Sequence, residues 1–332
     1  MHRAPSPIMF SKDALRIVPD VAVREISATL ATQVHEVLRR RGVVVGLSGG
    51  VDSSVVAALA ARALGPSKVL ALLMPERDSS PDSLRLGRLV ADRLGIPTIV
   101  EDIGGALAGF GCYERQEEAI RSVFPRYSTG WKCKITLPPV LDSDRLNVSR
   151  LTVRSPDGEE LSARMPPSAY LALVAATNFK QRARKSMEYF HADRLRYAVA
   201  GTPNRLEYDQ GFFVKQGDGA ADVKPIAHLY KTQVYQLAEH LGVPREVTER
   251  PPTTDTYSLE QTQEEFYFAL DYARMDLCLF AFNRGAAPAD VARACDLEVA
   301  QVERVFRDIE AKRRAAQYLH EPPLPVRAVE EV

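Results

Sequence analysis

The sequence lacks an excess of either charge, because 43 Lys and Arg residues balance 43 Asp and Glu residues. A neutral chain does not have the electrostatic footprint of a protein whose main partner is a nucleic acid. No apolar run approaches the length of a membrane span, and residues 1–7 lack the apolar stretch of a signal peptide. The four cysteines have no zinc or redox spacing, which is typical of a reducing compartment. We therefore expect a cytoplasmic protein without a nucleic-acid or membrane partner.

A glycine-containing loop stands between an expected strand and an expected helix. The apolar run 43–47 precedes Ser48-Gly49-Gly50-Val51-Asp52-Ser53-Ser54, and the helical run 55–61 follows. Backbone N–H groups at such a helix start favour a phosphate or pyrophosphate group. The loop has no lysine, which excludes the Walker type of nucleotide loop. An acid beside a phosphate needs a cation, so Asp52 is a candidate Mg²⁺ ligand; an ordinary Gly-Gly turn with Asp52 as N-cap is the alternative.

Strands and helices alternate along the first two thirds of the chain. Apolar runs predict strands over 43–47, 68–74, 97–101 and 197–202, and helical periodicity predicts helices over 21–40, 81–94, 168–191 and 230–241. Strands that are apolar on both faces predict an α/β fold with a doubly wound, mainly parallel sheet and helices on both faces. Ligands bind beyond the carboxyl ends of such strands, where the loop 48–54 and the segment after Thr202 both lie.

Two regions depart from this alternation within an expected single domain over 1–332. Residues 146–165 alternate in polarity around Pro156-Asp157-Gly158, which predicts a β-hairpin within an insertion over 132–167. Residues 257–332 form an expected helical C-terminal extension. The 287–317 part of it resembles a helix-turn-helix, but the neutral charge favours a packed helical pair over DNA binding.

A second informative segment runs from Gly201 to Thr232. It holds Glu207 and Lys231 together with further acids, lysines and glycines. A solvated charged loop is one interpretation. The position after a strand, at the carboxyl edge of the expected sheet, and the glycines that permit close backbone approach favour a ligand-binding segment.

Six motifs together resemble the NAD synthetases, within the ATP pyrophosphatases that carry the SGGxDS loop. They are SGGVDSS, NFKQR, GTPNRLE, FVKQGDGAAD, the Lys-Thr of LYKT, and PPTTD, and the match extends from about residue 21 to 256. The resemblance implies an adenine nucleotide alpha hydrolase-like fold and a homodimer with the dinucleotide site near the subunit interface.

The resemblance also implies roles for particular residues. It assigns Mg²⁺ binding to Asp52 and Glu207, substrate binding to Arg182, Lys215 and Asp222, and electrostatic catalysis to Asp52 and Lys231. The implied ATP-binding residues are Gly46, Leu47, Ser48, Gly49, Gly50, Val51, Asp52, Ser53, Thr202, Lys231 and Thr253.

The implied reaction is an ATP-dependent amidation that uses Mg²⁺. The nicotinate carboxylate of deamido-NAD attacks the α-phosphate of ATP and pyrophosphate leaves; ammonia then attacks the acyl-adenylate and releases NAD and AMP. About forty residues before the loop strand leave no room for a glutaminase domain, so we expect free ammonia or a separate ammonia-supplying protein.

Several alternatives remain open. A ligase of the same fold could amidate a different carboxylate, and a nucleotide-binding sensor could have lost turnover. Relatives often have a His-Lys pair near the C-terminus; here Lys312 could take its role or belong to a basic surface helix. The 146–165 hairpin could cover the active site, extend the dimer contact or reshape the pocket.

Overall fold

The computed structural model of the chain describes residues 11–137, 149–253, 256–268 and 270–330. Residues 146–148 of the expected hairpin, and Thr254 and Asp255 of the PPTTD motif, lie outside the described residues.

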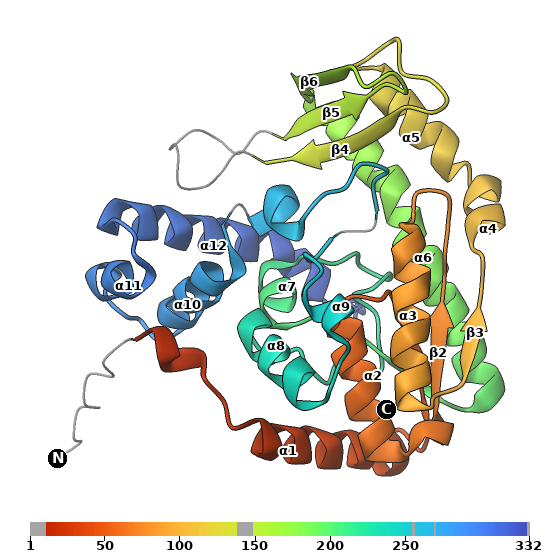
Figure 1. Ribbon diagram of the computed structural model, residues 1–332, viewed down its shortest axis with the longest axis vertical. Helices are drawn as coiled ribbons and strands as arrows, with labels where there is room; N and C mark the ends of the chain where they lie inside the picture. The colour runs from red at the N-terminus through yellow and green to blue at the C-terminus, as the bar shows by residue number, and fades with distance from the viewer. Residues whose placement is uncertain (1–10, 138–148, 254–255, 269, 331–332) are drawn as a thin grey trace.

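The larger sheet of the described structure is parallel, and its strands β2 and β3 lie at the right of Figure 1. Its strands stand in the order β3-β2-β1-β7, with bounds β1 Val43–Gly46, β2 Val69–Leu73, β3 Thr98–Val100 and β7 Ala198–Ala200. β1 pairs in parallel with both neighbours, Val43 opposite Val69 on one side and opposite Ala198 on the other. The residues of β2 and β7 are all buried, as strands covered on both faces require. The predicted doubly wound α/β fold is confirmed.

Helices cover both faces of this sheet. α1 (Pro19–Thr32), α2 (Val51–Leu64), α3 (Pro81–Leu94) and α8 (Lys231–His240) share an apolar core with Val43 and Val45 of β1. The other face, which includes Val44, packs against α6 (Pro167–Leu195). This alternation follows the two-residue period of a strand. Proline at the first position of α3 and the left-handed Gly95 after it explain why the sequence predicted its bounds so well.

Shorter elements connect these layers. They are η1 Lys12–Leu15, η2 Gln33–Val37, η3 Pro66–Lys68, α4 Gly104–Gly109, α5 Cys112–Arg121, α7 Arg205–Gln210, α9 Arg245–Thr248 and η4 Glu264–Phe268. The expected helix over 21–40 is α1 continued by the π-helical turn η2.

A second, antiparallel sheet lies at one end of the molecule, at the top of Figure 1. Its order is β4 (Lys132–Thr136), β5 (Arg150–Arg154) and β6 (Glu160–Arg164). β5 and β6 form the hairpin around residues 155–158, and β4 is a third strand that the sequence analysis did not predict. Cys133, Ile135, Leu151 and Val153 pack with the first turns of α6 in a separate apolar cluster. The division of the chain into domain and insertion stays a prediction.

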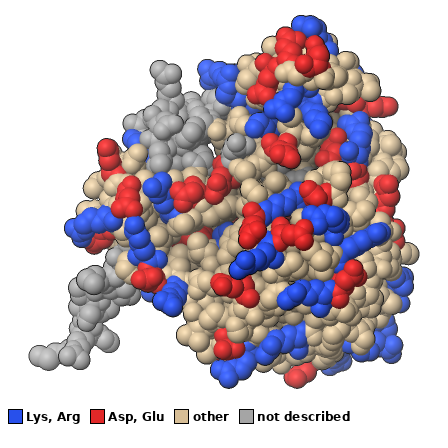
Figure 2. All heavy atoms as spheres, in the orientation of Figure 1, with Lys and Arg blue, Asp and Glu red and all other residues tan. Residues whose placement is uncertain are grey.

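The C-terminal region is helical. α10 (Tyr272–Asn283), α11 (Pro288–Cys295) and α12 (Val299–His320) share one apolar cluster, in which Val291 and Val302 are fully buried. α11 and α12 are thus a packed helical pair. On the face shown in Figure 2, basic and acidic side chains are interspersed. Among the described residues, no helix is long and apolar enough to cross a membrane.

Candidate nucleotide and metal site

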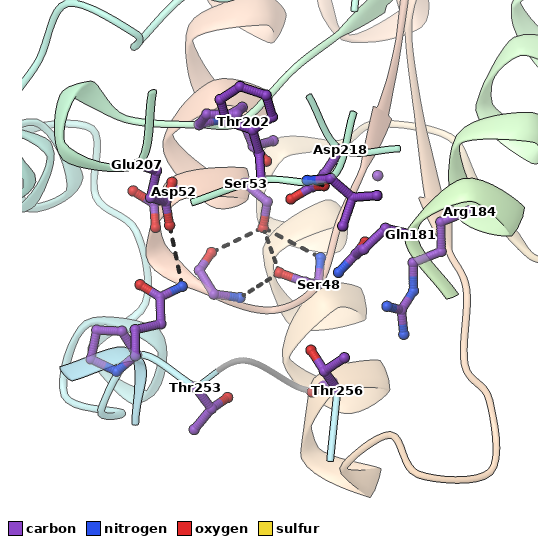
Figure 3. Close-up of a pocket in the computed structure, with 18 of the residues that line it drawn as sticks. Ser48, Asp52, Ser53, Gln181, Arg184, Thr202, Glu207, Asp218, Thr253 and Thr256 are labelled. Atoms are coloured by element: carbon purple, nitrogen blue, oxygen red, sulfur yellow. Dashed lines mark hydrogen bonds between the residues drawn. The ribbon is translucent and has the colours of Figure 1, made fainter. Parts of the chain in front are cut away.

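A pocket of about 390 Å³ opens at the carboxyl ends of β1 and β7. The glycine loop after β1 forms one side, and the segment after β7 lies beside it. α6 contributes a second wall with Gln181 and Arg184, and a third wall carries Thr253 and Thr256 (Figure 3). The pocket therefore occupies the position where open α/β sheets bind their ligands.

The glycine loop is shaped by its own hydrogen bonds. Gly49 has a φ of +75°, and a Cβ there would meet the Ser83 carbonyl oxygen at 2.8 Å, so this position requires glycine. The Ser48 N–H donates to Ser53 Oγ at 3.3 Å, and Ser53 Oγ donates to the Gly50 carbonyl at 3.0 Å (Figure 3). α2 begins at Val51, and the first N–H groups of a helix have no acceptor within the helix. The loop thus holds a helix N-terminus, which attracts anions, at the edge of the pocket.

Asp52 and Lys231 form an ion pair in this pocket. Lys231 is the first residue of α8, and its side chain is 1% exposed. The other Asp52 oxygen accepts a hydrogen bond from the Asn204 side chain at 3.1 Å. Burial lowers the pKa of Lys231, but the charges of Asp52 and Glu207 outweigh it, so the pKa lies above its ordinary value. The lysine therefore keeps its charge although it is buried.

Glu207 lies beside Asp52 (Figure 3). Its Oε2 accepts from the Asn204 N–H at 3.1 Å, in a capping box that begins α7. Its Oε1 accepts from the Gln263 side chain at 3.2 Å. Burial and the charge of Asp52 raise the pKa of Glu207 to about 8. Two carboxylates in one buried site disfavour a second negative charge unless a cation lies between them.

Gln263 joins this site to its surroundings. The Tyr272 hydroxyl donates to Gln263 Oε1, which directs the amide nitrogen toward Glu207. Tyr272 is 8% exposed, and burial holds its pKa well above the ordinary value, so its hydroxyl stays a donor. The position of Glu207 is thus fixed by Asn204 on one side and by Gln263 on the other.

The comparisons with known proteins agree with this geometry. The sequence model of the NAD synthase family matches residues 22–123 and 157–317. A curated NH(3)-dependent NAD(+) synthetase from Mesorhizobium japonicum is 65% identical over 302 residues, which are 91% of this chain and 95% of the relative. A second one, from Rhizobium meliloti, is 59% identical over 325 residues, 98% of this chain and 97% of the relative. The chain belongs to the NAD synthase family.

A solved structure has the same fold. The NH3-dependent NAD synthetase from Campylobacter jejuni, determined in complex with the nitrate ion, has a TM-score of 0.62 and 20% identity. The likeness covers 94% of this chain and the whole of that one. The family match omits residues 124–156, which contain β4 and β5.

Most of the residues to which the resemblance assigned ATP or metal binding come together in one pocket. Those that line it are Gly46, Leu47, Ser48, Gly50, Val51, Asp52, Ser53, Thr202, Glu207, Lys231 and Thr253. Gly49 does not line it, because it turns the loop against α3. The roles of these residues stay predictions, but their proximity is a property of the structure.

The three residues predicted to hold the dinucleotide lie elsewhere. None of Arg182, Lys215 and Asp222 lines the pocket. Arg182 is exposed and donates to the Lys215 carbonyl at 3.3 Å. Lys215 donates to the carbonyl groups of Tyr318 and Glu321, and Asp222 accepts from the Val199 N–H at 2.7 Å. In this structure they contact neighbouring backbone groups, and Asp222 also accepts from the Tyr189 hydroxyl at 3.2 Å, so their predicted role needs a surface outside the pocket.

Lys312 lies behind a wall of the pocket, and its predicted role at the ATP site stays a prediction. Its side chain is only 11% exposed, so it is not part of a basic surface. It does not line the pocket either, but donates to the Tyr267 carbonyl at 2.7 Å and pairs with Asp308 at 2.8 Å. Burial lowers the pKa of Lys312. Since Tyr267 does line the pocket, Lys312 supports a wall from behind.

Three residues of the site were not singled out from the sequence. Asn204 could have been found, because Asn followed three residues later by Glu207 has the spacing of a capping box. Gln263 and Tyr272 have no such local pattern. The contact of Gln263 with Glu207, and that of Tyr272 with Gln263, depend on how the chain returns to the pocket after β7.

Proposed function

We propose that the protein is an ammonia-dependent NAD synthetase that joins ammonia to the nicotinate carboxylate of deamido-NAD at the expense of ATP. The observation that carries this proposal is the grouping of the glycine loop, Asp52, Glu207 and Lys231 in one pocket. Relatives at 59–65% identity over most of the chain carry that name. The products are NAD, AMP and pyrophosphate.

The first step has an electrostatic obstacle that this pocket is suited to overcome. A carboxylate oxygen attacks the α-phosphorus of ATP, and the bond from that phosphorus to the bridging oxygen breaks. Negative charge builds on phosphorus and on the leaving pyrophosphate. The amides at the start of α2 and the charged Lys231 lie where they would stabilise that charge.

The second step requires no nucleophilic side chain. The lone pair of ammonia attacks the acyl carbon, the bond to the AMP oxygen breaks, and one proton leaves the nitrogen as the amide forms. The pocket has to hold the acyl-adenylate and ammonia together and to limit access of water.

The two carboxylates fit a magnesium ion. Mg²⁺ prefers one or two carboxylates together with phosphate oxygens, and Asp52 and Glu207 supply such a pair. Burial and the charge of Asp52 raise the pKa of Glu207, so a cation between the two carboxylates would favour the ionised form of Glu207. Asp52 and Glu207 would hold the ion, which would act as a Lewis acid on the phosphate oxygens of ATP.

The proposed assembly is a homodimer. Leu171 and Phe190 of α6 are 65% and 57% exposed, and Phe110 after α4 is 51% exposed. Large exposed apolar side chains on neighbouring elements favour an interface. A dinucleotide site shared between subunits would also account for the position of Arg182 outside the pocket. Sedimentation of the wild type and of the Leu171→Glu variant tests this assembly, with a monomeric wild type as the contradicting result.

We propose a cytoplasmic location on the basis of the cysteines. Cys112, Cys133, Cys278 and Cys295 are all buried and free in the described structure. Buried thiols of this kind suit a reducing compartment.

A screen of carboxylates tests the reaction. The protein is incubated with ATP, Mg²⁺ and ammonium, and pyrophosphate release is measured with deamido-NAD and with other carboxylates. We expect release with deamido-NAD and formation of NAD. Release only with another acid would mean that the ligase amidates a different substrate. ATP binding without any release would indicate a sensor. Replacing ammonium by glutamine should abolish the reaction unless an ammonia-supplying protein is added.

A further inference from the structure

One segment of the third pocket wall is tied to the antiparallel sheet. We call residues 256–263 the wall segment. Along it, hydrogen bonds to the free edge of β4 recur: the Cys133 N–H donates to Ser258 Oγ at 3.0 Å, and the Leu259 N–H donates to the Cys133 carbonyl at 3.0 Å. The Gln261 side chain donates to the Ile135 carbonyl. Since β5 occupies the other edge of β4, the wall segment continues this sheet on its open side.

The same segment faces the pocket. Thr256, Tyr257 and Gln263 line the cavity. Gln263 is the residue whose side chain donates to Glu207 Oε1 at 3.2 Å. The wall segment therefore reaches from the edge of β4 to the carboxylate pair of the active site.

The ends of the wall segment are held as well. At one end, the Lys180 ammonium donates to the Thr256 carbonyl at 2.9 Å. At the other, Thr262 forms an antiparallel bridge with Thr253, and the Gln263 N–H donates to the Pro252 carbonyl at 3.0 Å. Between these two ends, residues 258, 259 and 261 of the wall segment contact β4.

Side-chain packing reinforces the hydrogen bonds. Tyr257 is 6% exposed and belongs to the apolar cluster of Cys133, Ile135 and Leu151. Phe266 packs against the same cluster and lies 5.7 Å from Tyr257, ring centre to ring centre. One side of Tyr257 thus rests on the antiparallel sheet while the residue borders the cavity.

We propose that the β4–β6 sheet is a positioning element of the active site, which holds the wall segment in its binding conformation before any substrate arrives. The proposal deepens the proposed function, on which its kinetic part rests. It assigns to the sheet neither a lid nor a catalytic role. Its contribution is to keep Tyr257 and Gln263 in place on the ATP side of the pocket.

This role has a measurable consequence. If only a fraction of the molecules has the wall segment in place, the apparent dissociation constant for ATP rises by the inverse of that fraction. Once ATP is bound, the segment is in place, so turnover at saturation is unchanged. Loosening the segment should therefore raise KM and leave kcat nearly constant.

The experiment compares variants at the two side-chain contacts with β4. Ser258→Ala with Gln261→Ala removes both contacts. Ser258→Thr keeps the hydroxyl and serves as the conservative variant. Arg154→Ala is the matched control on the same sheet, because Arg154 is half exposed and, within the described residues, forms its ion pair with the half-exposed Glu160. Full-length proteins are used throughout.

Three readouts are taken. Hydrogen exchange of the ligand-free proteins follows the amides of residues 256–263, calorimetry follows the binding of ATP, and kinetics give KM and kcat. We expect the amides of this segment to exchange at least about tenfold faster in the double variant than in the wild type. The dissociation constant for ATP and the KM for ATP should each rise about tenfold, and kcat should stay within about twofold of the wild-type value. Ser258→Thr and Arg154→Ala should resemble the wild type.

The outcomes separate the two proposals. A wild type that forms no NAD refutes the proposed function, while exchange and ATP binding still test the positioning role. A double variant with wild-type exchange and ATP affinity, or one that loses kcat with KM unchanged, overturns the positioning role. Faster exchange throughout the molecule, together with a similar change in Arg154→Ala, would show general destabilisation and would also overturn it.

Discussion

Lys180 and Lys231, which are both fully buried, each lie beside a pair of carboxylates. Lys180 of α6 pairs with Glu76 at 3.0 Å and with Asp78 at 2.6 Å, and the side chains of Lys180 and Glu76 are fully buried. Lys231 of α8 pairs with Asp52 and lies near Glu207. Each cluster has one lysine, one aspartate and one glutamate, but the Lys180 cluster has a second cation, because Arg77 pairs with Asp78 at 3.3 Å.

The difference lies in how the second carboxylate is compensated. In the Lys180 cluster both acids contact the ammonium, and the Tyr113 hydroxyl donates to Glu76 Oε2 at 3.0 Å. In the Lys231 cluster, no ion pair to Glu207 is present among the described residues, and the pKa of Glu207 is raised to about 8. With Lys180 and Arg77 against Glu76 and Asp78, the Lys180 cluster is balanced in charge, whereas the Lys231 cluster has one lysine for two carboxylates. The first suits a structural clamp, and the second suits a site that binds a metal and a polyphosphate.

The largest effect is expected for Asp52→Asn on turnover. The variant removes one proposed metal ligand while keeping the shape of the side chain, so kcat should fall by roughly 10²–10³-fold. Loss of the Asp52 charge should let Glu207 ionise and compensate Lys231, which limits the loss of stability. Asp82→Asn, with a 61% exposed carboxylate on α3, is the control. Wild-type turnover in Asp52→Asn would refute the metal assignment.

The second prediction concerns Lys180→Met. It leaves the buried Glu76 without its cation and Asp78 with Arg77 alone, which should lower the free energy of unfolding by about 3–5 kcal/mol. The surface pair gives the contrast: Arg154→Met, opposite the exposed Glu160, should cost about 1 kcal/mol or less. Urea unfolding of both variants measures the difference. Equal decreases in the free energy of unfolding of the two variants would mean that the Lys180 cluster does not stabilise the fold more than a surface ion pair does.

Much of the fold could be predicted because its strands are buried on both faces. Short continuous apolar runs such as 69–73 are typical of central strands in an alternating α/β pattern, and the Gly after α3 marks its end. β4 was missed for a physical reason. Its five residues have one apolar face, and its partners β5 and the wall segment lie far along the chain. A short strand with distant partners has no local pattern that sets it apart.

The site could be predicted where its residues are neighbours in sequence. The loop 48–53 is local, and its amides and hydroxyls follow from the glycines and from the helix that begins at Val51. Gln263 contacts Glu207 across 56 positions, which no periodicity encodes. Arg182 was predicted from a motif alone. A motif gives an expected role but no neighbours, and in this structure Arg182 lies outside the pocket.

The third prediction uses Asp276, a buried acid next to the start of α8. It accepts from the Thr232 N–H at 2.7 Å, and burial raises its pKa from 3.8 to about 6. Between these values the folded protein keeps a proton that the unfolded chain has lost. The stabilising contribution of Asp276 is therefore fully present below pH 3.8 and is lost as the pH rises through about 6. The free energy of unfolding should fall by about 3 kcal/mol over this range. Asp276→Asn keeps an acceptor for Thr232 and removes this titration.

The measurement is the free energy of unfolding between pH 4.5 and pH 7. The wild type should lose stability relative to Asp276→Asn as the pH rises through this window. Parallel profiles would show that Asp276 is compensated by the charge of Lys231, as Asp52 is. The two profiles therefore show whether the charge of Lys231 stabilises the ionised form of Asp276.

The smallest effect, and the most direct test of the comparison, is the difference between Glu76→Gln and Glu207→Gln in metal-free protein at pH 7. Glu76→Gln removes a charge that Lys180 and Tyr113 both contact, which should cost about 1–3 kcal/mol. Glu207→Gln replaces a carboxyl that burial and Asp52 already keep largely protonated, so the cost should be close to zero. Addition of Mg²⁺ should then stabilise the wild type and Glu76→Gln but not Glu207→Gln, because binding to the folded state alone raises stability. Equal decreases in the free energy of unfolding of the two metal-free variants would mean that neighbouring groups already balance the charge of Glu207. The proposed cation site would then have to lie elsewhere.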